Sequence, residues 1–345
     1  MTRGMRVGGE DEIAIQMQYN DGGFDIAYEV VAPHIVLGGI GNKTAYSLSF
    51  SLATSAEKVT KALLDIVLST KNERLRRWKI ELSGVVLTRE FKPQICKKYS
   101  SGYVCKIIFD VTPIIRSKSS DNYLVNILYP DINNEINLLH IGLLTIINEE
   151  KAHTKYVYLT EPLILNPNEE VTIRLPFRLE NASIKMTVSI PHSSANLIIL
   201  TNNEKITISG YQGSLEYSNS LRRAETLTLT HIGKSSYFPK EIIVSSMLIY
   251  SSTAPKPVIN AEVKRIDSKS VEVVLENKGD GAASNVIVIN IAAGNIIDRK
   301  VIGSIYAKEK RAVVINIDPN YLNIIRVIWR FKDETHIIEK KIKMI

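Results

Sequence analysis

The sequence predicts an all-β protein composed of β-sandwiches, with a larger N-terminal region and a smaller C-terminal domain. Apolar and polar residues alternate with a period of two through much of the chain, as in residues 45–53, where tyrosine, leucine and phenylalanine alternate with serine. Helical periodicity is scarce, and stretches rich in Asn, Ser, Gly and Pro separate the alternating runs. This combination is typical of sandwiches and barrels.

The composition is that of a globular protein with room for more than one core. The 345 residues are 45% hydrophobic and 23% charged, and this length is enough for two or three domains. The net charge is +7, and residues 254–345 carry 16 Lys and Arg against 11 Asp and Glu. Because these basic residues alternate with acidic ones, we expect a solvated surface of mixed charge and no nucleic-acid partner.

Residues 1–24 contain no apolar run of the length that a signal peptide needs, and we expect them to form a tail or an edge strand. No window of the chain approaches about 18 consecutive apolar residues, so we expect no membrane span. The missing signal peptide favours the cytoplasm, unless the chain is exported by another route.

Residues 25–253 are expected to form a β-sandwich region, either as one unit or as two sandwiches that meet near residue 150. Its strands are predicted at residues 45–53, 61–69, 78–87, 103–112, 122–129, 136–147, 155–165, 170–177, 184–190, 195–201, 204–210, 226–232 and 241–251. The best helix candidate begins at Thr54, which could form a capping box with Glu57. Because residues 61–69 also suit a strand, we expect a short helix or turn followed by that strand.

The clearest boundary lies in residues 251–257, where small residues and two prolines provide the chemistry of a linker. The remainder, residues 257–345, divides into seven short strands, which is the number and size expected of an immunoglobulin-like sandwich. These strands are predicted at residues 258–266, 270–277, 284–292, 295–303, 311–317, 323–331 and 335–345.

The loop in residues 275–288 contains Asn277, Asp280 and Asn285, which could bind a ligand or shape a turn. With strands on both sides, we interpret it as a hairpin connection whose polar side chains bond their own backbone. Gly279 and Gly281 are then expected to supply positive φ angles.

Two family resemblances follow from these segments. Residues 271–290, VEVVLENKGDGAASNVIVIN, and residues 301–317, VIGSIYAKEKRAVVINI, resemble the CARDB-type immunoglobulin-like domains common in archaeal and bacterial surface proteins. This resemblance implies an archaeal, surface-associated protein whose residues 257–345 act as a spacer, adhesion or partner-binding module without catalysis. Extracellular or cell-surface localisation follows from it, in contrast to the missing signal peptide.

The N-terminal region resembles galactose-binding-like jelly rolls in residues 61–70, 78–87 and 107–127, which include an Asp-Val-Thr strand end. The resemblance implies a jelly-roll-like sandwich in which Asp110 and Thr112 anchor a turn and bind no ligand. The overall prediction is therefore a jelly-roll-like β-sandwich region followed by a seven-stranded immunoglobulin-like β-sandwich.

Cys96 and Cys105, the only cysteines, flank a stretch with Ser100, Ser101 and Gly102 that suits a hairpin turn. A cross-hairpin disulfide is one interpretation, and it implies an oxidising compartment or a thermophilic cytosol. The alternative is two reduced thiols.

No catalytic motif withstands inspection, and we expect no enzyme activity and no cofactor. Residues 38–44, GGIGNKT, lack two glycines of a phosphate loop and precede a strand where that loop needs a helix. Asp131, Asn133 and Glu135 begin like a calcium loop, but Ile136 stands where that loop needs glycine. An EF-hand is excluded, and an irregular structural calcium site is the alternative.

The predicted partners are a protein or a glycan, and the chain could oligomerise. The leading function is non-enzymatic adhesion, assembly or scaffolding at a surface. The alternative is carbohydrate binding by the jelly-roll-like region, with Tyr211, Tyr217 and Tyr237 as stacking surfaces, and a less favoured alternative is a polysaccharide-acting enzyme. Asn42 and Asn181 stand in N-glycosylation sequons, which matter only if the chain is exported.

Overall fold

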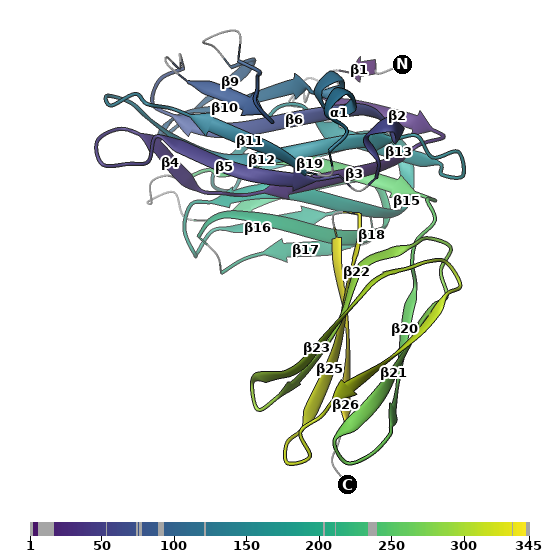
Figure 1. Cartoon of the computed structure of the whole chain (residues 1–345). Coiled ribbons are helices and arrows are strands. Elements are labelled where there is room, and N and C mark those ends of the chain that lie inside the picture. Colours follow the sequence, from purple (N-terminus) through teal and green to yellow (C-terminus); the bar gives the residue numbers. More distant parts are fainter. Residues whose placement is uncertain are drawn as a thin grey trace. The chain divides into compact units, whose positions relative to one another are not determined.

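The computed structural model describes residues 3–5, 17–52, 54–73, 75, 78–88, 93–120, 122–202, 204–210, 212–233, 240–332 and 334–342. The chain divides into two compact units, Met1–Thr253 and Ala254–Ile345, and the division falls inside the proline-containing segment 251–257. Antiparallel β-strands dominate both units, as Figure 1 shows, which confirms the all-β prediction.

The first half of the N-terminal unit is a sandwich of two sheets. A six-stranded sheet has the order β3-β12-β6-β10-β9, with β4 paired to β12, and it faces a four-stranded sheet of order β5-β11-β7-β8. Between them lies a core that includes Phe50, Leu64, Ile80 and Ile141. The strands are β3 (Asp25–Val31), β4 (Ile35–Gly38), β5 (Ala45–Ser51), β6 (Val59–Thr70), β7 (Lys79–Leu82), β8 (Val85–Val86), β9 (Ile95–Tyr99), β10 (Gly102–Asp110), β11 (Asn122–Leu128) and β12 (Glu135–Ile147).

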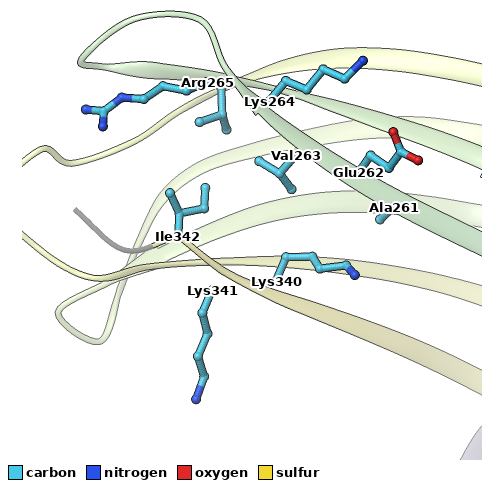
Figure 2. Close-up of a pocket in the computed structure, with 9 residues that line it drawn as sticks. Ala261, Glu262, Val263, Lys264, Arg265, Lys340, Lys341 and Ile342 are labelled. Atoms are coloured by element: carbon cyan, nitrogen blue, oxygen red, sulfur yellow. The ribbon is translucent and has the colours of Figure 1, made fainter. Parts of the chain in front are cut away.

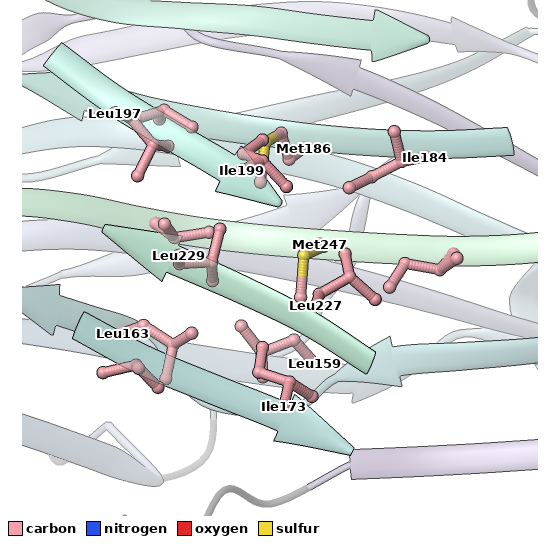
Figure 3. Packing of buried hydrophobic residues seen from close by; sticks show 14 of the residues in the cluster. Leu159, Leu163, Ile173, Ile184, Met186, Leu197, Ile199, Leu227, Leu229 and Met247 are labelled. Atoms are coloured by element: carbon pink, nitrogen blue, oxygen red, sulfur yellow. The ribbon is translucent and has the colours of Figure 1, made fainter. Parts of the chain in front are cut away.

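The second half is built on a nine-stranded sheet of order β1-β2-β13-β19-β15-β18-β16-β17, with β14 paired to β19. Its two longest strands contribute to the same core along most of their length, because Ile173 and Ile184 of one strand and Leu227 of the other belong to one buried cluster (Figure 3). The strands are β1 (Arg3–Met5), β2 (Met17–Gly22), β13 (Thr154–Leu159), β14 (Leu163–Leu165), β15 (Glu170–Ile190), β16 (Asn196–Leu200), β17 (Lys205–Ile208), β18 (Gly213–Ile232) and β19 (Ile242–Ser252).

The long strands bend at irregular positions in their pairing. The register of β15 against β18 shifts between Arg174 and Leu179, and its register against β19 shifts between Thr187 and Val188. Such irregularities bend and twist a strand, which lets one sheet enclose a core. The prediction of two separate strands at 170–177 and 184–190 was therefore wrong, because a bulge and a chain break look alike in sequence.

The six-stranded sheet is covered on both faces, and its second face packs on the nine-stranded sheet. Successive residues of β6 alternate between the two environments: Leu64 and Ile66 face the first core, whereas Leu63 and Val67 belong to clusters shared with the nine-stranded sheet. The N-terminal unit therefore has two main cores, and the chain passes from the first to the second between β12 and β13.

The helices differ from the expectation. A 3-10 helix, η1 (Ala56–Lys58), precedes β6, which agrees with the predicted short helix or turn, but its N-cap is Ser55 and no side-chain cap bond is made. The capping box of Thr54 and Glu57 was therefore wrong. Among the described residues there is also an α-helix, α1 (Thr112–Lys118), which was not predicted although a proline stands in its first turn, where proline favours a helix start.

Asp110 and Thr112 tie α1 to the first sandwich, as predicted for turn anchors. The Asp110 carboxylate accepts bonds from the Thr112 backbone N–H (3.1 Å) and hydroxyl (2.6 Å), and the same hydroxyl oxygen accepts a bond from the Ala62 N–H (2.8 Å). Both side chains therefore form hydrogen bonds within the chain.

The C-terminal unit is a sandwich of a three-stranded sheet, β20-β21-β24, and a four-stranded sheet, β23-β22-β25-β26. Its core includes Val273, Val288, Ile325 and Trp329. The seven strands are β20 (Ile259–Arg265), β21 (Ser270–Asn277), β22 (Ala283–Ala292), β23 (Asn295–Ile305), β24 (Lys310–Asn316), β25 (Asn323–Phe331) and β26 (Glu334–Ile342).

The loop after Asn277 is not a hairpin, because β21 and β22 belong to different sheets. The prediction that polar residues bond the local backbone holds for Asn277, whose Oδ1 accepts from the Gly279 and Val258 N–H groups (both 3.0 Å). The expected positive φ at Gly279 and Gly281 was wrong; Asn285 has one instead, at 51°. The two glycines are needed because the backbone of residues 255–258 passes close to them.

Candidate functional site

A cluster of ionisable and hydroxyl side chains lies between the six-stranded and nine-stranded sheets. Asp65, Lys106 and His140 are its charged or chargeable members, and all three side chains are 0% exposed. A buried group of this kind is the arrangement that most often marks either a catalytic centre or a structural ion cluster.

Asp65 is the hub of the cluster. Its Oδ2 accepts bonds from the hydroxyls of Tyr158 (2.7 Å), Tyr28 (3.0 Å) and Ser246 (3.0 Å), and it lies 3.1 Å from both Lys106 Nζ and His140 Nε2. The carboxylate therefore meets partners from five different strands.

Lys106 links the cluster to the nine-stranded sheet by hydrogen bonds. Its Nζ donates to the Leu159 carbonyl oxygen (2.9 Å) and to Ser246 Oγ (3.0 Å), and it lies 4.8 Å from the centre of the Tyr158 ring. With Asp65 as a further acceptor, the donors of this buried ammonium group are used. His140 makes a similar link, since its Nδ1 lies 2.9 Å from Thr187 Oγ1.

A register shift and a glycine in β12 allow these side chains to occupy the junction between the two sheets. A register shift in β12 between Leu138 and His140 lets the neighbouring residues Leu139 and His140 both face the nine-stranded sheet. Two residues on, Gly142 leaves the space that the cluster fills, because a Cβ there would lie 2.5 Å from Asp65 Oδ1 and 2.7 Å from His140 Nε2.

The electrostatics of the cluster follow from burial and from its internal charges. Desolvation alone would raise the pKa of Asp65, but His140, Lys106 and the hydrogen bonds to the carboxylate hold that pKa well below its usual range. Desolvation lowers the pKa of Lys106, and the charge of Asp65 opposes this shift in part. Burial, reinforced by Asp65, raises the pKa of Tyr28 and of Tyr158 well above the usual value.

The cluster is closed to solvent and its members satisfy one another. An acid or base that acts on a substrate must come within hydrogen-bond reach of it. Because Asp65, Lys106 and His140 are 0% exposed, the arrangement fits a structural junction between two sheets better than a reaction centre.

A cavity of about 250 Å³ lies at the rim of the same sheet junction. The six-stranded sheet contributes Ser69, Tyr99 and Asn137, and the nine-stranded sheet contributes Ser189 and Ile243. The remaining lining residues are His34, Leu139, Ile190, Pro191, Gln212 and Gly213. Among these described residues no Asp, Glu, Lys or Arg lines the cavity, so it suits a neutral ligand.

One side-chain atom of a residue that lines this cavity is left without a partner. Asn137 Oδ1 is buried and accepts no hydrogen bond from any residue that the structure describes. A buried acceptor in this state costs about 1–3 kcal/mol.

Cys96 and Cys105 are directly opposite each other in the β9–β10 hairpin and are joined by a disulfide. The closed loop is short, with a sequence separation of 9, so in the chain-entropy picture the crosslink stabilises the fold by about 2–3 kcal/mol. Cys105 is buried in the core of the first sandwich, and Cys96 is packed against it.

The remaining predicted site residues do not come together. Asn42 and Asn181 are both exposed, and Asn42 Nδ2 donates to the Gly38 carbonyl oxygen (2.8 Å). Tyr217 is half-buried against the second core, which makes it unsuitable as an open stacking surface. Tyr211 and Tyr237 lie outside the described residues.

Asp131 acts as a turn anchor. Its carboxylate accepts bonds from the backbone N–H groups of Asn133 (2.9 Å) and Asn134 (3.2 Å), and exposed Glu135 lies 3.8 Å from Lys71 Nζ. In the part of the chain that the structure describes, no group of three or more His, Cys, Asp or Glu side chains is placed to hold a metal ion.

Sequence reasoning missed the ion cluster, although a signal was present. Asp65, Lys106 and His140 each interrupt an otherwise apolar run within a strand, in LLDIVL, VCKIIF and LLHIGL. A single charged residue in a fully buried strand needs a partner, so three such strands together could have indicated a shared cluster.

No known protein family and no curated protein matches the sequence. Solved structures share only weak similarity. A peptide-N(4)-(N-acetyl-β-D-glucosaminyl) asparagine amidase is 10% identical, covering 66% of this chain and 96% of its own, with a TM-score of 0.27. A β-D-glucuronidase from Dictyoglomus thermophilum is 10% identical, covering 99% of this chain and 45% of its own, with a TM-score of 0.19. No functional conclusion follows from similarities this weak.

Among the described residues, none of the helices has the length and apolar character to cross a membrane.

Proposed function

We propose that the protein is a non-enzymatic β-sandwich protein for adhesion, assembly or scaffolding at a cell or particle surface, with the C-terminal unit as a spacer or docking module. The observation that carries the proposal is the closure of the ion cluster. Asp65, Lys106 and His140 are the side chains best suited to acid–base chemistry, yet all three are 0% exposed, and each contacts a side chain or carbonyl group of the nine-stranded sheet. Side chains that are buried and paired in this way hold the two sheets together, and a substrate cannot contact them.

A turnover screen combined with cell fractionation tests this function. The purified full chain is incubated with oligosaccharides and glycopeptides, and products are followed by mass spectrometry. We expect no product from the natural sequence or from Asp65→Asn, and we expect the native protein in the surface or particle fraction.

Two results would contradict the proposal. Product release that disappears in a folded Asp65→Asn variant would make the cluster catalytic. Recovery of the native protein only as a full-length cytosolic product would remove the surface role.

The cavity at the sheet rim favours a second candidate, which is binding of a neutral carbohydrate. Its lining combines hydroxyl, amide and imidazole groups with the apolar faces of Tyr99 and Pro191, and Asn137 Oδ1 is an unused buried acceptor. Sugar hydroxyls provide donors for such an acceptor, and sugar C–H faces pack on apolar groups.

Asn137→Leu is expected to weaken glycan binding about tenfold or more, because it removes the buried acceptor while conserving most of the volume. A glycan array identifies the ligand, and calorimetry compares variants. Asn219→Leu is the matched control, since among the described residues the exposed side chain of Asn219 bonds only to the adjacent Ser220 N–H. Absence of binding to every glycan, or equal loss in both variants, would defeat this candidate.

A further inference from the structure

The C-terminal sandwich is open along one side. β20 is the outermost strand of the three-stranded sheet and β26 is the outermost strand of the four-stranded sheet, so each has one edge without a strand partner among the described residues. Exposed strand edges are templates for pairing with another chain.

A groove of about 640 Å³ runs between these two edges. Ala261, Val263 and Val271 line it from the three-stranded sheet, and Ile342 lines it from β26. Val263 and Ile342 are half-buried against the core of the sandwich. Figure 2 shows these side chains between the two edge strands, so the groove gives access to an apolar floor.

Basic residues surround that floor. The groove is lined by Lys264, Arg265, Lys340 and Lys341, with Glu262 as the acidic exception (Figure 2). In β26, Lys340 stands two residues from Ile338 and from Ile342, both of which pack on the core, so it occupies a position on the inward face.

Three lysines that line the groove lie apart from carboxylates. Lys264, Lys340 and Lys341 make no ion pair with any residue that the structure describes. Elsewhere in the unit some cations lie within 4 Å of a carboxylate, namely Lys278, Lys300, Lys308, Lys310, Arg311 and Arg326, whereas no ion pair joins Lys256, Lys269 or Arg299 to a described residue. The groove therefore concentrates positive charge that the chain itself does not neutralise.

We propose that the groove between β20 and β26 binds an extended acidic segment of a partner protein as an added strand. Backbone groups of the segment pair with the free edge of β20 or β26, and its apolar side chains, at every second position, cover Val263 and Ile342. Its acidic side chains, on the opposite face of the added strand, meet Lys341 or Lys264, which alternate with Ile342 and Val263 along the two edge strands. This inference rests on the docking role proposed above for the C-terminal unit and gives that role a partner chemistry.

Charge favours a foreign segment over a second copy. Edge-to-edge pairing of two identical grooves would bring the lysines of both copies together, and inward-facing charges on an edge strand oppose such pairing. An acidic strand turns the same charges into attractive partners.

The test uses the full chain and a short fluorescent peptide in which Asp or Glu alternates with Val. A peptide of the same composition, with the acids and valines in separate blocks, is the comparison ligand. Anisotropy titrations are expected to show binding of the alternating peptide and at least about tenfold weaker binding of the block peptide. Hydrogen exchange of residues 259–265 or 334–342 is expected to slow when the alternating peptide binds.

Lys341→Glu is expected to weaken binding about tenfold or more, since it places a like charge against the acidic side chains of the segment. Arg299→Glu is the matched control: it makes the same charge change on exposed β23, outside the groove, and should leave binding unchanged. Circular dichroism establishes that both variants fold.

Four results would overturn the inference. These are no binding of the alternating peptide, equal binding of both peptides, equal competition by double-stranded DNA as a general polyanion, or self-association of the chain that Lys341→Glu abolishes. None of them bears on turnover or on cell fractionation, so a failure here leaves the proposed surface function to its own test.

Discussion

Gly279→Val is expected to unfold the C-terminal sandwich, with a loss of more than about 4 kcal/mol from a domain whose total stability is on the order of 5–15 kcal/mol. A Cβ at residue 279 would lie 2.1 Å from the Lys256 carbonyl oxygen and 2.5 Å from the Val258 nitrogen. Both atoms belong to the backbone, so no side-chain rotation relieves the overlap. The segment that enters β20 would have to move away from the loop that Asn277 organises.

Hydrogen exchange with mass spectrometry measures this effect by region. In Gly279→Val we expect residues 259–331 to lose protection, whereas β6 and β12 of the N-terminal unit keep theirs. Gly294→Ala is the control, because residue 294 has a φ of 80° and nothing within 4 Å of a Cβ. It should cost only about 1 kcal/mol, the usual penalty of a left-handed conformation. Full protection of residues 259–331 in Gly279→Val would mean that the close approach of residues 255–258 is wrong.

The loop after Asn277 shows that local sequence predicts strands but does not predict which strands pair. The two flanking strands and the role of Asn277 as a backbone anchor could be predicted from the alternation and from the turn chemistry of asparagine. Whether those strands pair with each other could not, because a hairpin and a crossing between two sheets have the same local composition. That choice depends on pairing with β24 and β25, which lie far along the chain.

The candidate sites show a related limit. The pattern of residues 213–220 places Tyr217 on the same strand face as Leu215, but that this face packs partly against a core depends on the pairing of β18 with β15. Likewise, Asp65 and His140 are 75 residues apart in sequence and meet only because β6 pairs with β12. Strand positions follow from local pattern, whereas sites follow from long-range pairing.

Asp65→Ala is expected to destabilise the N-terminal unit by about 3–5 kcal/mol, because it leaves Lys106 and His140 buried without their carboxylate. Chemical denaturation followed by tryptophan fluorescence measures the loss, since Trp78 is buried in the core of the first sandwich. Glu135→Ala is the control, because Glu135 pairs with Lys71 in an exposed setting and such pairs contribute about 0–1 kcal/mol.

A double variant separates loss of the carboxylate from loss of packing. Asp65→Leu combined with Lys106→Met replaces the buried ions with apolar groups of similar size, and such replacements are often neutral. We therefore expect the double variant to be more stable than Asp65→Leu alone. A double variant that is as unstable as the sum of the two single ones would show that the residues do not interact.

The acid dependence of stability provides an independent signature of the cluster. Folding lowers the pKa of Asp65 from its ordinary value of 3.8, so the folded state favours the ionised carboxylate. Its contribution is therefore fully present above that value and is lost as the pH falls from about 4 towards the folded-state pKa. Asp65→Asn cannot titrate, so its stability should fall less steeply over this acidic range than that of the natural sequence. Equal slopes for the two proteins in acid denaturation would mean that Asp65 is not ionised within the junction, and the cluster would then join the two sheets through neutral hydrogen bonds.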